Sequence, residues 1–124
     1  MWVKHSEYLR YVEYRTDTHT ALSFALHKDV LVLKIAGADT KQARVPRYWK
    51  ESPAYWHHIS TKWSSSTGNW KIYLDGSLVS FMHGVASGIE LPTQGELFMG
   101  LGNPDNGDLS MDGGLSRLNI WDYE

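Results

Sequence analysis

Residues 56–63, WHHISTKW, and residues 69–75, NWKIYLD, form the stretch of sequence that decides the fold. Apolar and polar residues alternate in both segments, a pattern typical of β-strands with one buried face. The second segment is the clearer one, because every second residue from Trp70 to Leu74 is apolar. The serine-rich residues 64–69 favour a turn, so the two strands are expected to be neighbours.

A tight hairpin is expected directly after this pair. Asp75-Gly76 precedes the apolar segment SLVSF (77–81). Glycine accepts the positive φ that a type I′ turn requires, so this dipeptide predicts antiparallel pairing of the flanking strands.

Similar patterns extend in both directions. Further strands are expected over residues 7–15, 20–27, 29–36, 96–101 and 115–122, with a short strand near 43–45 and loops over 37–55, 84–96 and 102–114. Segment 29–36 is expected to be buried on both faces, and Leu118 and Ile120 are expected to point inward. No helical pattern is convincing. The prediction is one all-β domain over residues 1–124, an antiparallel β-sandwich of jelly-roll type.

The composition excludes several classes of protein. The 124 residues include 12 Lys and Arg against 14 Asp and Glu, and the net charge of −2 argues against a nucleic-acid-binding surface. No apolar run is long enough to insert into a membrane, and residues 1–15 contain no signal-peptide segment. The absence of cysteine excludes disulfides and cysteine-ligated zinc.

Five short motifs occur in a particular order. They are Trp56-His57-His58, Trp63, Gly68, the segment from Trp70 to Gly76, and the segment from Leu118 to Asp122. Together they resemble the latter part of a pentraxin domain, in which a W-x-H strand, a Trp, a turn, a strand ending in D-G and a last strand ending N-x-W-D follow one another. The resemblance implies a jelly roll of lectin type, shared with laminin-G-like domains, and ring-like oligomers.

Two features depart from the family pattern. Where a pentraxin carries a disulfide-bonded cysteine, this chain has Ser60. The chain is also shorter than a full pentraxin domain, and we expect its front to be missing. An excised fragment, a compact variant and a cytosolic relative remain alternatives.

The segment 102–113 (GNPDNGDLSMDG) is rich in oxygen-bearing side chains. Calcium takes six to eight oxygen ligands from carboxylates and carbonyls. The resemblance implies that this segment holds Ca²⁺, with Asp105 as the principal ligand and Asn103, Asp108 and Asp112 as further candidates. The alternative is that these residues only form turns.

A second candidate site combines aromatic and basic residues. Tyr48, Trp49, Tyr55 and Arg47 are predicted to contact a ligand or a protein partner, since aromatic residues and arginine are enriched in interfaces. The alternative is that Trp49 fills the core beneath a loop.

The sequence offers little support for zinc or catalysis. His57 and His58 are adjacent in a strand and therefore point to opposite faces, so they cannot both bind one metal ion without distortion. A G-x-S-x-G nucleophile elbow, the carboxylate pattern of related glycoside hydrolases and a dinucleotide fingerprint are all missing from the sequence.

The sequence thus predicts a non-enzymatic extracellular recognition module that binds a protein, a carbohydrate or an anionic ligand through its end loops, with calcium as cofactor. The alternative is a structural adhesion or assembly module without metal that packs on neighbouring domains or subunits. The extracellular assignment holds if the chain was excised from a larger secreted or membrane protein, and not if Met1 is the native start.

Overall fold

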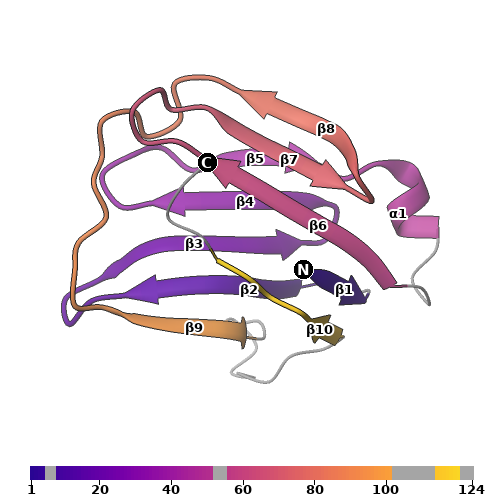
Figure 1. Ribbon diagram of the computed structural model, residues 1–124, viewed down its shortest axis with the longest axis horizontal. Helices are drawn as coiled ribbons and strands as arrows, with labels where there is room; N and C mark the ends of the chain where they lie inside the picture. Colours follow the sequence, from indigo (N-terminus) through magenta and orange to yellow (C-terminus); the bar gives the residue numbers. More distant parts are fainter. Residues whose placement is uncertain (5–7, 52–55, 102–113, 121–124) are drawn as a thin grey trace.

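The computed structural model describes residues 1–4, 8–51, 56–101 and 114–120. They form two antiparallel sheets that lie one over the other (Figure 1). The first sheet has the order β10 (Gly114–Ser116), β1 (Trp2–Lys4), β6 (Trp56–Trp63), β7 (Trp70–Leu74), β8 (Ser77–Met82). The second sheet has the order β5 (Lys41–Arg44), β4 (Val30–Ile35), β3 (Thr20–His27), β2 (Tyr8–Arg15), β9 (Glu96–Leu101). The predicted antiparallel sandwich is confirmed.

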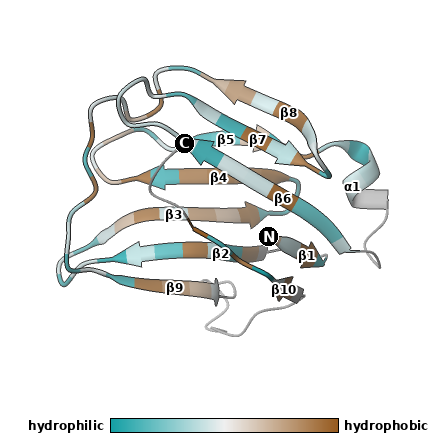
Figure 2. Ribbon diagram, viewed as in Figure 1, coloured by the Kyte–Doolittle hydropathy of each residue, from teal (hydrophilic) through white to brown (hydrophobic). Residues whose placement is uncertain are grey.

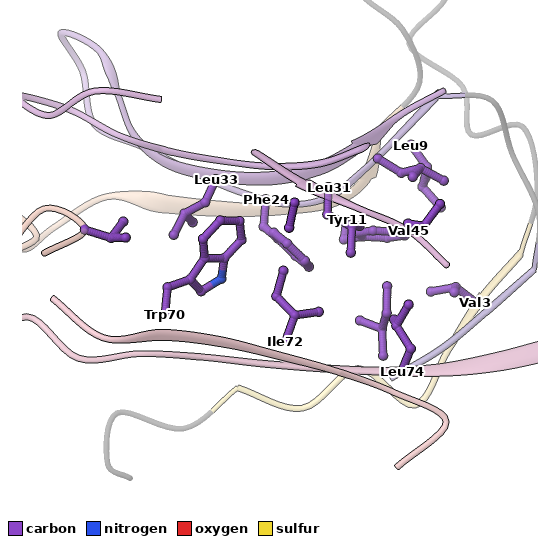
Figure 3. Close-up of a cluster of buried hydrophobic side chains, with 14 of the residues drawn as sticks. Val3, Leu9, Tyr11, Phe24, Leu31, Leu33, Val45, Trp70, Ile72 and Leu74 are labelled. Atoms are coloured by element: carbon purple, nitrogen blue, oxygen red, sulfur yellow. The ribbon is translucent and has the colours of Figure 1, made fainter. Parts of the chain in front are cut away.

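The core lies between the sheets and is filled by their inward-facing side chains (Figure 3). Trp70, Ile72 and Leu74 of β7 are 1%, 0% and 0% exposed, as the alternation predicted. The Trp70 ring meets Phe24 of the opposite sheet edge-on, with ring centroids 6.4 Å apart. Its indole N–H donates a hydrogen bond to the hydroxyl of Thr61 over 2.8 Å, so the buried polar atom of this tryptophan has a partner.

The predicted hairpin at Asp75-Gly76 is confirmed. Both residues have positive φ, 50° for Asp75 and 84° for Gly76, as a type I′ turn requires. Leu74 and Ser77 are directly paired across the turn, so β7 and β8 are joined by the shortest type of hairpin loop.

The long loop predicted after β8 is also confirmed, and it carries the chain from the first sheet to the second. The indole N–H of Trp63 donates to the carbonyl of Val85 over 2.7 Å, and the Val85 amide donates to the carbonyl of Gly68 over 2.8 Å. Gly68 has φ of 70°, and a Cβ at this position would lie 2.7 Å from the Val85 nitrogen. Only glycine fits this contact without a shift of the backbone.

The expectation that segment 29–36 is buried on both faces is wrong. Its inward-facing residues are buried, but Val30 and Val32 are only half-buried and Lys34 is exposed. The described residues place no layer over the outer face of the second sheet. Figure 2 accordingly shows hydrophobic and hydrophilic stretches mixed along the strands of both sheets.

Segment 37–55 was expected to contain no helix, but residues Arg47–Glu51 form the short helix α1. Pro46 precedes it, and the amide of Trp49 donates to the Pro46 carbonyl over 3.1 Å. Proline favours the start of a helix because its φ is already helical. Five residues are too few to produce a helical periodicity in the sequence. No helix within the described ranges is long and apolar enough to span a membrane.

The last predicted strand, residues 115–122, is much shorter than expected. β10 ends at Ser116, and Arg117 follows with φ of 53°, a left-handed conformation that interrupts a strand. Ile120 is 55% exposed, so the expectation that it points inward is wrong, whereas Leu118 is half-buried. Strand β1, which pairs with β6, was not predicted because three residues give no pattern.

Replacement of Trp70 by alanine tests the assignment of the core. Because Trp70 is fully buried, Trp70→Ala is expected to lower the free energy of unfolding by about 3–5 kcal/mol, measured by urea denaturation. Leu78→Ala on β8, where the side chain is 51% exposed, serves as the control and is expected to change stability by less than about 0.5 kcal/mol. Equal effects of the two substitutions would contradict the assigned core.

Candidate functional site

The outer face of the second sheet, which points away from the core, contains a hollow of about 340 Å³. Its lining includes charged and polar side chains from β2, β3 and β4, namely Arg10, Glu13, Ser23, His27 and Lys34, with Thr40 and Gln42 at one side. Ala25 and Val32 also line it, so the hollow combines polar and charged walls with an apolar part.

Ser23 and Ala25 form the floor of this hollow. Their neighbours Phe24 and Leu26 are core residues, so by alternation Ser23 and Ala25 point outward. Both are nevertheless only 7% exposed. Two small side chains surrounded by longer ones create the concavity.

A β-bulge determines which side chains of β2 reach the hollow. The register of β2 against β3 shifts between Arg10 and Val12, which are paired with Ala25 and Phe24 respectively. Tyr11 is thus an extra residue, and Arg10 and Glu13 both point outward although they are three positions apart. In a regular strand they would lie on opposite faces.

The two residues brought together by the bulge form the centre of a hydrogen-bonded network. Glu13, 5% exposed, accepts hydrogen bonds from Arg10 over 2.7 Å, from Arg15 over 2.8 Å and from the Thr20 hydroxyl over 3.0 Å. Burial alone raises the pKa of Glu13, but the hydrogen bonds from Arg15 and Thr20 and the charges of Arg10 and Arg15 outweigh it, so the pKa lies below its ordinary value.

The network leaves the hollow with an excess of donors and positive charge. The negative charge of Glu13 is matched by the two arginines, while His27 and Lys34 also face the hollow. Arginine, lysine and hydroxyl groups bind phosphate, carboxylate and sugar oxygens through charge-assisted hydrogen bonds. The arrangement is suited to holding a small anionic or hydroxyl-rich group.

A second, more open hollow of about 580 Å³ lies at one end of the sandwich, between the β4–β5 connection and the loop after β8. Glycine, alanine and serine residues form much of its lining, and Asp39 and Lys41 are the charged residues in it. These segments are end loops of the kind expected to bind a ligand, but they offer fewer side-chain donors than the hollow of the second sheet.

The structure separates the residues of the predicted aromatic site. Tyr48 is 44% exposed and Arg47 is also exposed, whereas Trp49 is 3% exposed and belongs to the core. The Trp49 ring stacks against His57, with centroids 4.7 Å apart, and His57 in turn contacts Asp75 over 2.9 Å. The alternative stated for Trp49, that it fills the core, is therefore the correct one, because the short helix turns this side chain inward. Tyr55 lies outside the described residues.

The predicted calcium ligands Asn103, Asp105, Asp108 and Asp112 also lie outside the described residues, and the calcium site stays a prediction. Within the part of the chain that the structure describes, no group of three or more His, Asp or Glu residues could hold a metal ion.

Comparison with known proteins identifies the family of the chain. The sequence model of the Pentaxin family matches residues 7–124. The chain belongs to the pentraxin family. The resemblance seen in residues 56–122 is therefore confirmed, and the two-sheet sandwich is the pentraxin jelly roll.

Individual relatives are larger proteins that contain a pentraxin domain. The sushi, von Willebrand factor type A, EGF and pentraxin domain-containing protein 1 of Mus musculus is 28% identical over 138 aligned residues, which cover 98% of this chain and 4% of that protein. The neuronal pentraxin receptor of Mus musculus is 30% identical over 88 residues, 67% of this chain and 17% of that protein. The chain spans only a small part of the length of these relatives.

The hollow on the second sheet was not predicted from the sequence. Strict alternation over residues 7–15 would place Arg10 on the same face of the strand as Tyr8, Val12 and Tyr14. The only signal for the bulge is Glu13, a carboxylate that a regular strand would place toward the core beside Tyr11.

The charge of Glu13 should matter for stability in a pH-dependent way. Glu13→Gln keeps the shape but leaves Arg10 without its buried counter-charge, and is expected to cost about 3 kcal/mol at pH 7. Because the folded pKa of Glu13 is lowered, this stabilisation is present above the unfolded pKa of about 4.3 and is lost as the pH falls through the folded pKa. Urea denaturation of both proteins between pH 7 and pH 2 measures the difference, and a difference independent of pH would contradict this role of the carboxylate.

Proposed function

We propose that this pentraxin domain is a non-enzymatic recognition module that binds an anionic or hydroxyl-rich ligand in the hollow on the outer face of its second sheet. The observation that carries the proposal is the pair of small, buried, outward-facing residues Ser23 and Ala25 beneath Arg10, His27 and Lys34. A hollow with a small-residue floor and polar walls is the geometry of a binding site.

The electrostatics of the hollow support an anionic group on the ligand. Arg10 is held by Glu13, so its guanidinium is fixed in position before a ligand arrives. Lys34 is an exposed cation at the rim. A preorganised donor set lowers the entropic cost of binding, and the lysine adds charge-assisted hydrogen bonds.

Calcium and the end loops form the second part of the proposal. Membership of the pentraxin family supports a Ca²⁺ site formed by Asn103, Asp105, Asp108 and Asp112. Bound calcium would supply further positive charge for an anionic ligand or a protein partner. Arg47, Tyr48 and Tyr55 are proposed as partner contacts, and extracellular location is proposed on the basis of the relatives.

One observation favours the alternative role, a structural adhesion or assembly module. At the edge strand β9, Leu97 is 46% exposed and Met99 is 54% exposed. Their partners on β2, Tyr14 and Val12, face the core side of the sheet, so Leu97 and Met99 lie on that side too. A sheet edge with exposed apolar side chains accepts a further strand from another subunit or domain.

The hollow can be tested with inorganic phosphate as the probe. Binding is expected to shift the NMR amide signals of Ser23, Ala25 and Lys34, and Lys34→Gln should weaken it about tenfold through the loss of one charge-assisted hydrogen bond. Lys28→Gln, at the β3–β4 turn and outside the lining, is the control with the same change of charge. Unchanged signals at Ser23 and Ala25, or equal weakening by both substitutions, would overturn the assignment.

The calcium site is tested independently by thermal unfolding. Calcium at 100 times its Kd is expected to stabilise the native state by about 2.7 kcal/mol, which raises the Tm by several degrees. Asp105→Ala should abolish this rise. If millimolar calcium leaves the Tm of the unsubstituted protein unchanged, the calcium part of the proposal fails, whereas the phosphate titration decides the hollow separately.

A further inference from the structure

Within the part of the chain that the structure describes, three of the four sheet edges have features that discourage pairing with another strand. β10 has three residues, and β5 has four, of which Lys41 and Arg44 are charged. β8 is longer, but its pairing with β7 is interrupted by a bulge at Val79. Short edge strands, charged residues and bulges are the means by which proteins keep sheet edges from pairing with other chains.

The fourth edge, β9, lacks these features. It has six residues, β2 is its one described partner, and the register between the two strands does not shift (Figure 1). Its sequence, ELFMGL, contains one charged residue, Glu96, at the beginning of the strand. The backbone N–H and C=O groups on the side of β9 away from β2 are therefore suited to pairing with a further strand.

The apolar side chains of β9 also lack cover. Leu97 and Met99 lie on the core side of the second sheet, yet they are 46% and 54% exposed. On the inner strands of the same sheet, the core residues Leu9 and Leu26 are each 1% exposed. The core is thus open beside β9, and a strand added at this edge would extend the core over Leu97 and Met99.

We propose that β9 pairs with β9 of a second copy of this chain, in antiparallel orientation, with Phe98 opposite its own counterpart at a twofold axis. In this register Leu97 of each copy is opposite Met99 of the other, on the core side. Glu96 is opposite Gly100, so no like charges face each other. The second sheets of the two copies then form one continuous sheet.

The sequence of β9 favours a second copy over an unrelated strand, because it is complementary to itself. A register displaced by one residue would place Leu97 opposite Phe98, whose side chain lies on the other face of the strand. On that outer face, the guanidinium of Arg15 lies 4.4 Å from the centroid of the Phe98 ring. The two Phe98 rings would meet at the axis, each with its own arginine beside it.

This contact differs from the ring-like oligomers that the family resemblance implies. A twofold contact uses the same surface on both copies, so it closes at two copies, whereas a ring needs two different surfaces on each. The inference rests on the alternative role given above for the edge strand β9, and it requires neither the hollow nor calcium. Because the contact is small, we expect a Kd of roughly 10–100 µM.

Sedimentation equilibrium at about 0.2 mM protein in EDTA tests the proposal, since this concentration exceeds the expected Kd. The unsubstituted chain is expected to be mainly dimeric. Met99→Lys should weaken dimerisation at least tenfold, because each dimer contains the substitution twice. Leu78→Lys, which introduces the same charge at a similarly exposed residue of the edge strand β8, is the control and should leave the Kd within twofold. Circular dichroism spectra of both variants should match that of the unsubstituted chain.

Single cysteine variants test the register, since the chain contains no other cysteine. Phe98→Cys should form a covalent dimer under mild oxidation, because directly opposite Cβ atoms lie about 4.5–5.5 Å apart. Glu96→Cys is the matched control on the same strand. The two substituted positions would be roughly 14 Å apart along the paired strands, too far for a disulfide, and this variant should stay uncrosslinked.

Four results would overturn the proposal: a monomeric unsubstituted chain, assemblies larger than two copies, equal effects of the two lysine substitutions, or cross-linking of Glu96→Cys as fast as that of Phe98→Cys. The phosphate-induced shifts at Ser23 and Ala25 should be the same in Met99→Lys as in the unsubstituted chain. The outcome at the β9 edge is therefore separate from the outcome at the hollow.

Discussion

The burial of one face of β7 against the second sheet is the constraint on which the rest of the molecule depends. Trp70, Ile72 and Leu74 are almost fully excluded from solvent, and the Trp70 ring meets Phe24 edge-on across the core. A shift of the register by one residue would expose all three residues of β7, so the pairing of this strand is strongly specified. The outward direction of Lys71 follows from the same constraint.

At the bulge at Tyr11, strand β2 departs from the regular alternation of inward-facing and outward-facing side chains. A regular strand would put either Arg10 or Glu13 into the core, where a charged side chain is costly. The extra residue lets both face outward and meet over 2.7 Å. A buried ion pair is weak evidence of added stability, since desolvation offsets much of the attraction. Its clearer consequence is geometric, because a fixed Arg10 side chain forms one wall of the hollow.

Elements with a strong pattern could be predicted from the sequence, and short elements could not. Strand 56–63 and the hairpin at Asp75-Gly76 were predicted with their observed bounds, because alternation and a turn dipeptide are local signals. The helix α1 is too short for any periodicity. The error at Ile120 has a different cause, since the positive φ of Arg117 that ends the strand leaves no mark in the hydrophobic pattern.

The candidate sites were harder to predict than the fold for a related reason. Exposure of an aromatic residue depends on its neighbours in space, and Trp49 is buried because α1 turns it onto His57, which lies on β6. The hollow depends on a register shift between two strands, which alternation alone does not reveal. Oxygen-rich composition, by contrast, is visible in residues 102–113 without any knowledge of the fold.

Local charge, rather than the net charge of the chain, determines what each face of this sandwich can bind. Stacked sheets lie about 10 Å apart, and outward-facing side chains add to that distance, while the Debye length in physiological salt is about 8 Å. The charge of the Glu13 carboxylate is also balanced by Arg10 and Arg15 on its own face, so it has little influence on the first sheet. The strands of both sheets contain more basic than acidic residues, so the net charge of −2 comes from the segments outside the strands. The electrostatic potential at each outer face is thus determined mainly by the side chains of that face.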